Sequence, residues 1–313
     1  MRVLVTGGAG FVGSNLVHAL AARGDSVRIF DDFSTGRREN LAGLGADVEI
    51  VRGDVRDADA VRRAMQGIET VLHEAALPSV QRSLEDPLAS HRSNADGTLN
   101  VLMAARDAGA QRVVYASSSS VYGNSSVLPK REDQAPMPAS PYAVAKLAGE
   151  HYTLAFSRCF GLATVALRYF NVFGPRQDPN SAYAAVIPRF VHAALRGTSP
   201  LIFGDGTQTR DFTFIDNVVD ANLRALTSEE ARGQVLNVAA GVRVSLIDLL
   251  ALLGKIVGRP LRAEHVPPRG GEVKDSQADI AAAGKALGYE PHIELEEGLR
   301  RTVAWYKAAA KRN

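Results

Sequence analysis

Short apolar runs alternate with longer helical patterns over the first 170 residues of the chain. Six runs have the length and aliphatic character of buried strands, at residues 3–6, 26–31, 47–51, 69–73, 112–117 and 163–167. Between them, apolar residues recur with a helical period at 11–23, 58–65, 96–108 and 142–160. This alternation predicts an α/β fold with a doubly wound parallel sheet of the Rossmann type.

The pattern changes after Tyr169, where prolines at 175, 179, 188 and 200 divide the chain into loops and short elements. We therefore expect one domain over 1–170 and a smaller α/β lobe over 171–313. A strand followed by a helix is expected at 210–226, so we expect residues 210–240 to return to the first domain. Two final helices are expected at 279–287 and 294–307.

The composition is that of a globular protein and excludes several classes. Of the 313 residues, 46% are apolar and 22% are charged, and the formal net charge is +2. So small an excess defines no nucleic-acid-binding face, and no apolar run is long enough to span a membrane. The single cysteine, Cys159, excludes an intrachain disulfide, and we expect it to be buried. Metal-ligand spacings are absent, so the expectation is a cytoplasmic protein without metal, nucleic-acid or membrane partners.

A glycine fingerprint separates the first predicted strand from the first predicted helix. The segment TGGAGFVG at 6–13 places Gly7, Gly10 and Gly13 at this turn. The first glycine permits the tight turn, the second lets the backbone approach a pyrophosphate, and the third lets the helix pack closely on the sheet. Backbone N–H groups at the helix N-terminus then bind the phosphates. The segment therefore predicts a dinucleotide site.

Acidic residues after the second and third predicted strands favour NAD over NADP. Asp31 lies 18 residues beyond the fingerprint, near the position of an acid that binds the adenine ribose. Asp31 and Asp32 would together repel a 2′-phosphate, although Arg37 and Arg38 lie nearby in the sequence. Asp54, after the third strand, is a candidate acceptor for the adenine amino group.

Tyr142 and Lys146, in the segment YAVAK, lie one helical turn apart and share one helix face. Upstream, the strand at 112–117 leads into four serines at 117–120. Tyrosine titrates near ~10, too high for a base at neutral pH, and an adjacent ammonium favours the phenolate. A serine hydroxyl can hold a substrate oxygen and share its proton. The combination predicts hydride transfer at a carbinol carbon, with Lys146 and the positive nicotinamide ring together lowering the pKa of Tyr142.

The motifs TGGAGFVG, SSSSVYG, YAVAK and RYFNVFGPRQDP resemble those of the extended short-chain dehydrogenase/reductase family. Within it, essentially the whole chain is similar to nucleotide-sugar 4-epimerases of the UDP-glucose and UDP-N-acetylglucosamine type. The resemblance implies a catalytic Ser118, Tyr142 and Lys146, with Ser119 and Ser120 as alternatives for the serine. It also implies that the first domain binds NAD and the second a nucleotide sugar. The implied NAD contacts are Gly7, Gly10, Phe11, Val12, Gly13, Asp31, Asp32, Asp54, Val55, Ala75, Ala76, Tyr142, Lys146 and Tyr169.

The resemblance also implies a set of residues that bind a UDP-sugar. Ser118 and Tyr142 would contact the sugar. Asn171 would hold the diphosphate and Arg210 and Arg269 would neutralise it, because arginine presents a bidentate fork to phosphate. The remaining positions would contact uracil, the uridine ribose and the sugar C2 substituent, namely Val186, Leu201, Phe203, Glu272 and Ser276.

Four features distinguish between subfamilies that resemble the chain. The serines at 118–120 replace the carboxylate that related dehydratases and decarboxylases carry before VYG. Asp178 stands where uronate epimerases tend to have arginine and would repel a C6 carboxylate. Ser276 leaves room for an N-acetyl group, and Pro78 replaces a lysine of strict galactose enzymes. These features favour a neutral hexose.

The implied reaction is NAD-dependent inversion of C4 of a UDP-hexose through a transient 4-keto intermediate. Its substrates would be UDP-glucose and UDP-galactose, together with their N-acetyl counterparts. Three alternatives stay open: a UDP-glucuronate 4-epimerase, a nucleotide-sugar dehydratase or decarboxylase, and a non-catalytic NAD-binding regulator. The resemblance also implies a homodimer formed by a four-helix bundle, with helices around 92–108 and 142–160 from each subunit.

Overall fold

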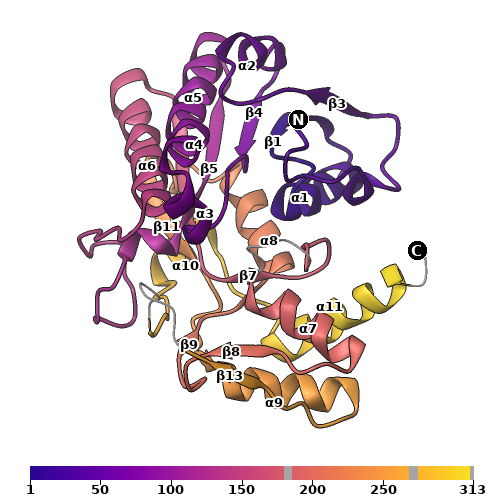
Figure 1. Cartoon of the computed structure of the whole chain (residues 1–313). Helices are drawn as coiled ribbons and strands as arrows, with labels where there is room; N and C mark the ends of the chain where they lie inside the picture. The colour runs from indigo at the N-terminus through magenta and orange to yellow at the C-terminus, as the bar shows by residue number, and fades with distance from the viewer. Residues whose placement is uncertain (180–184, 268–273, 311–313) are drawn as a thin grey trace.

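A seven-stranded parallel sheet forms the centre of the molecule (Figure 1). The computed structural model describes residues 1–179, 185–267 and 274–310. The strand order is β11-β6-β5-β4-β1-β2-β3. Their bounds are β1 (Arg2–Thr6), β2 (Ser26–Asp31), β3 (Val48–Arg52), β4 (Thr70–His73), β5 (Arg112–Ser118), β6 (Ala163–Tyr169) and β11 (Gln234–Val238). The predicted α/β fold with a doubly wound parallel sheet is confirmed.

Helices cover both faces of this sheet. On one face α5 (Gly97–Asp107) packs between α2 (Ala58–Ala64) and α6 (Pro141–Phe160), over a cluster of buried apolar residues. On the other face α1 (Phe11–Ala22) packs beside α8 (Ile215–Ala225). Shorter helical segments connect these elements, namely α3 (Val80–Glu85), α4 (Pro87–His91), η1 (Arg38–Leu41), η2 (Arg92–Asp96) and η3 (Ser119–Tyr122).

The smaller lobe is a layer of three helices against a parallel strand pair (Figure 1). The helices α7 (Val186–Arg196), α9 (Leu246–Val257) and α11 (Leu295–Ala310) pack on one another, and β8 (Leu201–Phe203) pairs with β13 (Glu264–Val266). The remaining elements are β7 (Val172–Phe173), β9 (Thr209–Arg210), β10 (Thr213–Phe214), β12 (Val244–Ser245) and α10 (Ala281–Leu287). One apolar cluster runs from the sheet through α8 into this lobe, so the two parts share a core.

Two expectations about burial are wrong. β3 was expected to be buried, yet it forms the edge of the sheet, and Ile50 is 45% exposed because only β2 pairs with it. Cys159 was also expected to be buried, but it is exposed near the end of α6, on the side of the helix turned away from the sheet.

The strand order places a topological switch point between β1 and β4. Ligands of open α/β sheets bind beyond the carboxyl ends of the strands at such a point. Here the ends of β1, β4, β5 and β6 lead directly into Gly7, Glu74, Ser119 and Phe170. Among the described residues, no helix is long and apolar enough to cross a membrane, and no group of candidate metal ligands is found.

Candidate active site

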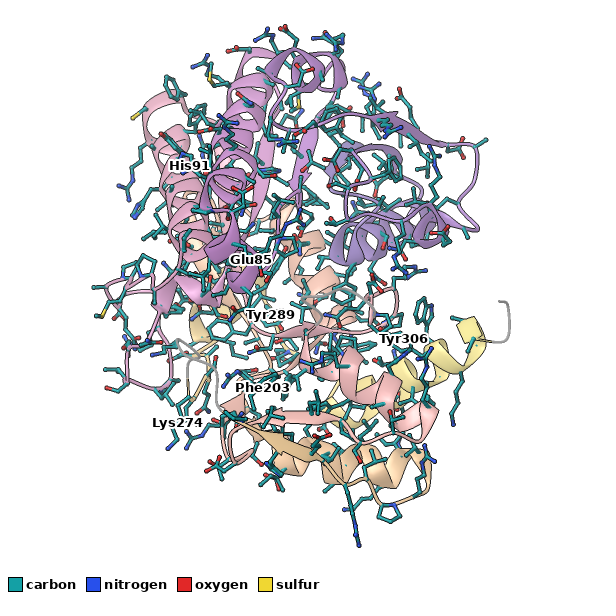
Figure 2. All side chains as sticks on the ribbon, in the orientation of Figure 1. Glu85, His91, Phe203, Lys274, Tyr289 and Tyr306 are labelled. Atoms are coloured by element: carbon teal, nitrogen blue, oxygen red, sulfur yellow. The ribbon has the colours of Figure 1, made fainter. Side chains whose placement is uncertain are left out.

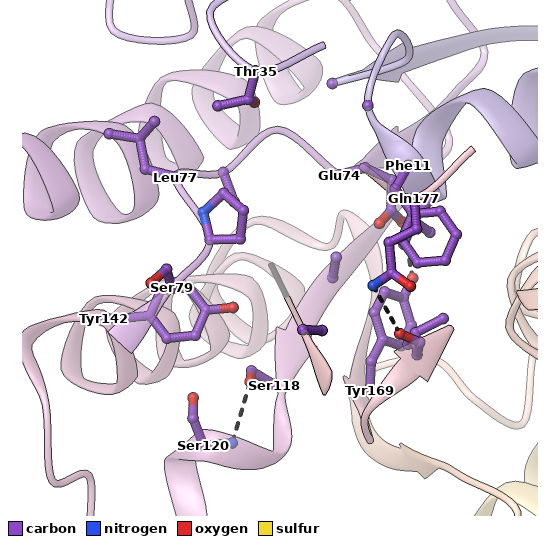
Figure 3. A pocket seen from close by; sticks show the side chains of 18 of the residues that line it. Phe11, Thr35, Glu74, Leu77, Ser79, Ser118, Ser120, Tyr142, Tyr169 and Gln177 are labelled. Carbon is purple, nitrogen blue, oxygen red and sulfur yellow. Dashed lines mark hydrogen bonds between the residues drawn. The ribbon is translucent and has the colours of Figure 1, made fainter. Parts of the chain in front are cut away.

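A cleft of about 1170 Å³ opens beyond the carboxyl ends of the strands and extends to the smaller lobe (Figure 3). Every predicted site residue that the structure describes lines this cleft. Arg269 and Glu272 lie outside the described residues. The predicted residues brought together are Gly7, Gly10, Phe11, Val12, Gly13, Asp31, Asp32, Asp54, Val55, Ala75, Ala76, Ser118, Tyr142, Lys146, Tyr169, Asn171, Val186, Leu201, Phe203, Arg210 and Ser276.

The turn between β1 and α1 forms a cradle that only small residues can line. Gly7 has a φ of 68°, and a Cβ there would lie 2.7 Å from the backbone nitrogen of Ala75. A Cβ at Gly13 would lie 2.2 Å from the carbonyl oxygen of Gly7. Gly10 caps α1 without a side-chain hydrogen bond, and the first turn of α1 has no acidic residue. This arrangement fits the pyrophosphate of a dinucleotide.

Asp31, at the end of β2, is fixed by the backbone around it. Its two carboxylate oxygens accept hydrogen bonds from the N–H groups of Ala9 (2.9 Å) and Phe33 (2.8 Å). Burial raises the pKa of Asp31, while these two hydrogen bonds lower it. At the end of the adjacent strand, hydrogen bonds from Arg56 hold the pKa of Asp54 below its usual value. Both predicted adenosine-side acids therefore lie in the cleft with ordered carboxylates.

The two arginines that follow β2 are engaged within the protein. Arg37 forms an ion pair with Asp178, and the guanidinium of Arg38 lies 4.8 Å from the ring centroid of Phe33. Both arginines lie close to the predicted adenosine site in the sequence, where they could favour NADP, but their partners reduce their availability to a 2′-phosphate. The same ion pair neutralises much of the negative charge that was expected to repel a C6 carboxylate.

The predicted catalytic residues meet where β5 ends and α6 begins. Ser140 caps α6 by accepting a hydrogen bond from the N–H of Ala143 (3.2 Å), which sets the start of the helix. Tyr142 and Lys146 then lie on one face of its first turns. The Lys146 ammonium donates to the carbonyl oxygen of Ala116 (2.8 Å). Ser118 and Tyr142 face the same space in Figure 3.

Among the four serines, the geometry favours Ser118 as the partner of Tyr142. Ser117 turns away from the cleft floor, because its hydroxyl donates to the buried carboxylate of Glu150 (2.8 Å). The hydroxyl of Ser118 accepts from the N–H of Ser120 (3.2 Å) and interacts with the Tyr142 hydroxyl. The Ser120 hydroxyl is buried without a hydrogen-bond partner among the described residues.

Burial controls the titration of this group. It lowers the pKa of Lys146 to about 8 and raises the pKa of Tyr142, although the interaction with Ser118 lowers the latter. The expectation that Lys146 and the positive nicotinamide ring together lower the pKa of Tyr142 stays a prediction. Burial disfavours the charged form of the phenol, so positive charge beside it is needed for the phenolate.

The smaller lobe contributes apolar and cationic residues to the other end of the cleft. Arg210 donates from one nitrogen to the carbonyl oxygens of Thr209 and Lys274, both at 2.9 Å. The guanidinium of Arg189 lies 5.8 Å from the ring centroid of Phe203. Sequence reasoning missed Arg189, since an arginine inside an amphipathic helix carries no local signal of function.

Glu74 is a second cleft residue that sequence reasoning missed. It follows β4 directly and accepts a hydrogen bond from the hydroxyl of Tyr169 (2.8 Å), as Figure 3 shows. Burial raises the pKa of Glu74 to about 7. The available signal was an acid at the carboxyl end of a buried parallel strand, the position at which α/β sheets bind ligands.

Comparison with known proteins agrees with this geometry. The model of the NAD dependent epimerase/dehydratase family matches residues 3–239. A UDP-glucose 4-epimerase of Mycolicibacterium smegmatis is 42% identical over 311 residues, which is 98% of this chain and 99% of the relative.

Solved structures with high similarity carry different sugar nucleotides. The UDP-N-acetylglucosamine 4-epimerase of Methanobrevibacter ruminantium, in complex with UDP-N-acetylmuramic acid, has a TM-score of 0.94 at 38% identity and covers 98% of both chains. The UDP-glucuronic acid 4-epimerase of Bacillus cereus, in complex with UDP-glucuronic acid and NAD, has a TM-score of 0.92 at 34% identity. This comparison covers 99% of this chain and 100% of the other.

Proposed function

Since the chain belongs to the NAD-dependent epimerase/dehydratase family, with NAD as its cofactor, we propose that it inverts C4 of a UDP-hexose. The proposed substrates are UDP-glucose and UDP-galactose, together with UDP-N-acetylglucosamine and UDP-N-acetylgalactosamine. The observation that carries the proposal is that Ser118, Tyr142 and Lys146 line the same cleft as the glycine cradle.

In the proposed mechanism, Tyr142 removes the proton of the sugar 4-hydroxyl. The glycine turn at Gly7, Gly10 and Gly13 would hold NAD, which would supply a reversible hydride acceptor for C4 and a positive charge that favours the phenolate. Lys146, held by the carbonyl of Ala116, adds a second positive charge on the same helix face. Ser118 holds the 4-oxygen and shares its proton.

Inversion requires the 4-keto sugar to turn while its UDP stays bound. Arg210 suits this anchoring role, because two carbonyl oxygens already fix its guanidinium. We propose that Asn171 and Arg269 also contact the diphosphate and that Glu272 contacts the uridine ribose. The uracil would lie among the apolar residues of α7 and β8, namely Val186, Leu201 and Phe203.

A UDP-glucuronate 4-epimerase is the second candidate function. The specific observation that favours it is the ion pair between Arg37 and Asp178, which weakens the repulsion of a C6 carboxylate. The similarity to the Bacillus cereus enzyme points the same way. We keep the neutral hexose as the first proposal because the small Ser276 lines the cleft and leaves space beside a sugar substituent.

Elimination or decarboxylation is less consistent with the site. Each would be helped by a carboxylate beside the catalytic serine, and positions 118–120 are all serine. A non-catalytic role is also less consistent, because both Tyr142 and Lys146 are present and face the cleft.

The test is to incubate the purified protein, without added cofactor, with UDP-galactose, UDP-N-acetylgalactosamine and UDP-galacturonate separately. Inversion at C4 is followed by proton NMR. We expect turnover of a neutral sugar, and we expect Tyr142→Phe to lose at least about 100-fold in rate while keeping bound NAD. Turnover of the uronate alone would favour the second candidate. Near-native turnover by Tyr142→Phe would contradict the proposed base.

We also propose that the protein is a homodimer formed through α5 and α6. Met103 on α5 and Val144 and Tyr152 on α6 are 41%, 50% and 40% exposed, although they are large apolar or aromatic side chains. Val144 and Tyr152 are two helical turns apart and share a face. Exposed apolar residues on adjacent helices are typical of an interface. Sedimentation of the purified protein at micromolar concentration tests this, and Val144→Glu is expected to give monomers.

A further inference from the structure

Glu74 occupies a position where a hydrophobic or neutral residue would pack more easily. It follows β4 at the floor of the cleft, near Phe11, the first residue of α1 (Figure 3). Transfer of a carboxylate from water into such a site is costly unless neighbouring groups bind it. The groups that contact the Glu74 carboxylate therefore indicate the function of its charge.

A chain of hydrogen bonds fixes the orientation of the Glu74 carboxylate. The side-chain amide of Asn222 donates one hydrogen to the carbonyl oxygen of Val218 (2.8 Å) and one to the hydroxyl oxygen of Tyr169 (2.8 Å). The Tyr169 hydroxyl donates its own hydrogen to Glu74 (2.8 Å), with the amide oxygen of Asn222 (3.0 Å) as the more distant competing acceptor. Burial and the charge of Glu74 hold the pKa of Tyr169 far above its usual value, so this hydroxyl remains a donor.

Lys146 lacks a close carboxylate in the described part of the chain. It is 3% exposed, and its ammonium donates a hydrogen bond to an uncharged acceptor, the carbonyl oxygen of Ala116. The carboxylate of Glu150 lies one turn further along α6, but Arg168 binds both of its oxygens. Glu74 directly follows His73, which pairs with Tyr115 of β5, and the carbonyl that binds the Lys146 ammonium belongs to the next residue of β5, Ala116. The end of β4 therefore brings Glu74 beside the strand end that holds Lys146, and the charge of Glu74 raises the pKa of Lys146 against the effect of burial.

We propose that Glu74 is a positioning residue for the hydride-transfer reaction, a counter-charge held in place by Tyr169 and Asn222 that keeps Lys146 protonated. The benefit for catalysis rests on the proposed function, but the electrostatic coupling of the two side chains does not. Without Glu74, Lys146 would lose its proton at a lower pH, and the positive charge that assists Tyr142 would be lost with it.

The other titratable groups that face this pair do not change charge near neutral pH. Tyr115 of β5 contributes its ring, whose centroid is 5.1 Å from the Lys146 nitrogen, and burial holds its pKa well above the usual value. Burial also raises the pKa of Tyr142 and lowers that of His73, at the end of β4, to about 3. A titration of Lys146 in this range is therefore attributable to the lysine and to Glu74.

The test measures the titration of Lys146 directly by NMR of protein labelled with ¹³C at the lysine Cε atoms and carrying its bound NAD. The chain has seven lysines, and Lys146→Met assigns the resonance. We expect Glu74→Gln, which keeps the shape and removes the charge, to lower the titration midpoint of Lys146 by at least about half a pH unit. The matched control is Glu39→Gln, which removes the same charge at an exposed position of η1.

Kinetics provide a second readout in the same variants. The alkaline limb of kcat/KM is expected to move to lower pH in Glu74→Gln by the same amount as the NMR midpoint. Should Glu74→Gln fail to fold, Glu74→Asp replaces it, and retention of the charge predicts a smaller shift. Identical Lys146 midpoints in the wild type and the Glu74 variant would overturn the proposal. A shifted midpoint in a protein that inverts none of the three sugars would contradict the proposed function alone.

Discussion

Tyr142, Lys146 and Glu74 are ionisable residues that line the cleft, and burial disfavours the charged form of each. Burial brings the pKa of Lys146 down to about 8 and that of Glu74 up to about 7. Between these values both side chains carry charge and stabilise each other. Burial raises the pKa of Tyr142. The proposed base therefore depends on the positive charge of the bound cofactor.

His73 is the neutral counterpart of this group, and its burial predicts how stability depends on pH. Its ring nitrogens lie 2.7 Å from the Thr6 hydroxyl and 3.0 Å from the Thr98 hydroxyl, and burial lowers its pKa to about 3. In the unfolded chain histidine titrates near ~6.5, so below that pH the unfolded state binds a proton that the folded state does not. The free energy of unfolding therefore decreases as the pH falls from ~6.5 toward ~3, by up to about 1.4 kcal/mol per pH unit.

We predict that His73→Gln makes the free energy of unfolding less dependent on pH between roughly pH 6.5 and 4.5. The decrease in slope corresponds to about one proton fewer taken up on unfolding. Urea unfolding at half-unit steps of pH measures it. His91→Gln is the matched control, because the His91 side chain is 56% exposed and the variant keeps His73, so the slope that His73 contributes is expected to remain. Equal slopes in wild type and His73→Gln would show that His73 is protonated in the folded protein.

At the scale of elements, strand ends rather than whole strands make the site. The register between β5 and β6 pairs Ser118 with Tyr169, so the proposed catalytic serine and the partner of Glu74 lie on adjacent strands. The strand β1 continues into Gly7, whose backbone lies against Ala75 at the end of β4. The parallel sheet therefore brings four segments, distant in the sequence, to one edge.

The turn between β1 and α1 gives a prediction at this scale. Gly13→Ala places a Cβ 2.2 Å from the carbonyl oxygen of Gly7, so α1 must move away from the strand. We expect a loss of about 1–3 kcal/mol in the free energy of unfolding and a loss of bound NAD, measured by urea unfolding and by cofactor content. In Gly45→Ala the new Cβ has no atom within 4 Å, and the backbone there is unstrained.

This control variant is expected to keep its NAD and to be unchanged or up to about 1 kcal/mol more stable. Equal NAD content in the two alanine variants would contradict the close approach of α1 to the strand. The comparison therefore separates a general cost of replacing glycine from the specific cost at the cradle.

Much of the fold was predictable from the sequence because local patterns carry it. The strands are apolar runs of the right length, and the start of α6 follows from Ser140 and the Tyr142–Lys146 spacing. The exposed edge position of β3 was not predictable, because an apolar run does not indicate whether one strand or two will pair with it in the sheet. The ion pair between Arg37 and Asp178 joins residues 141 positions apart, and no local pattern encodes such a contact.

At the scale of the whole molecule, contacts beside the cleft join the two lobes. Arg176, in the segment after β7, donates a hydrogen bond to Asn15 on α1 (2.7 Å), and the next residue, Gln177, accepts one from the Tyr306 hydroxyl on α11, so this segment links α1 of the larger lobe to α11 of the smaller. Beneath these contacts, a single apolar cluster contains residues of α1, α8, α9 and α11. A shared core of this kind predicts that the lobes unfold together.

Leu253→Ala tests this cooperativity from the smaller lobe. Leu253 on α9 is 1% exposed, and truncation of such a leucine costs about 2–5 kcal/mol. The single tryptophan, Trp305 on α11, packs against the same cluster, so its fluorescence reports on the smaller lobe. Release of NAD from the glycine cradle reports on the larger lobe. We expect urea to produce one transition by both probes, shifted equally to lower denaturant concentration in the variant.

The matched control is Ile247→Ala on the same helix, where the side chain is 47% exposed and the expected cost is well below that of Leu253→Ala. If the fluorescence midpoint of Leu253→Ala moved while NAD release stayed at the wild-type concentration, the lobes would unfold independently. The shared core argues against that outcome, because a cavity at Leu253 removes contacts from the cluster that also supports α1 and α8. Both sides of the cleft are supported by this one apolar cluster. The side proposed to bind the sugar nucleotide is therefore expected to unfold together with the side proposed to bind the dinucleotide.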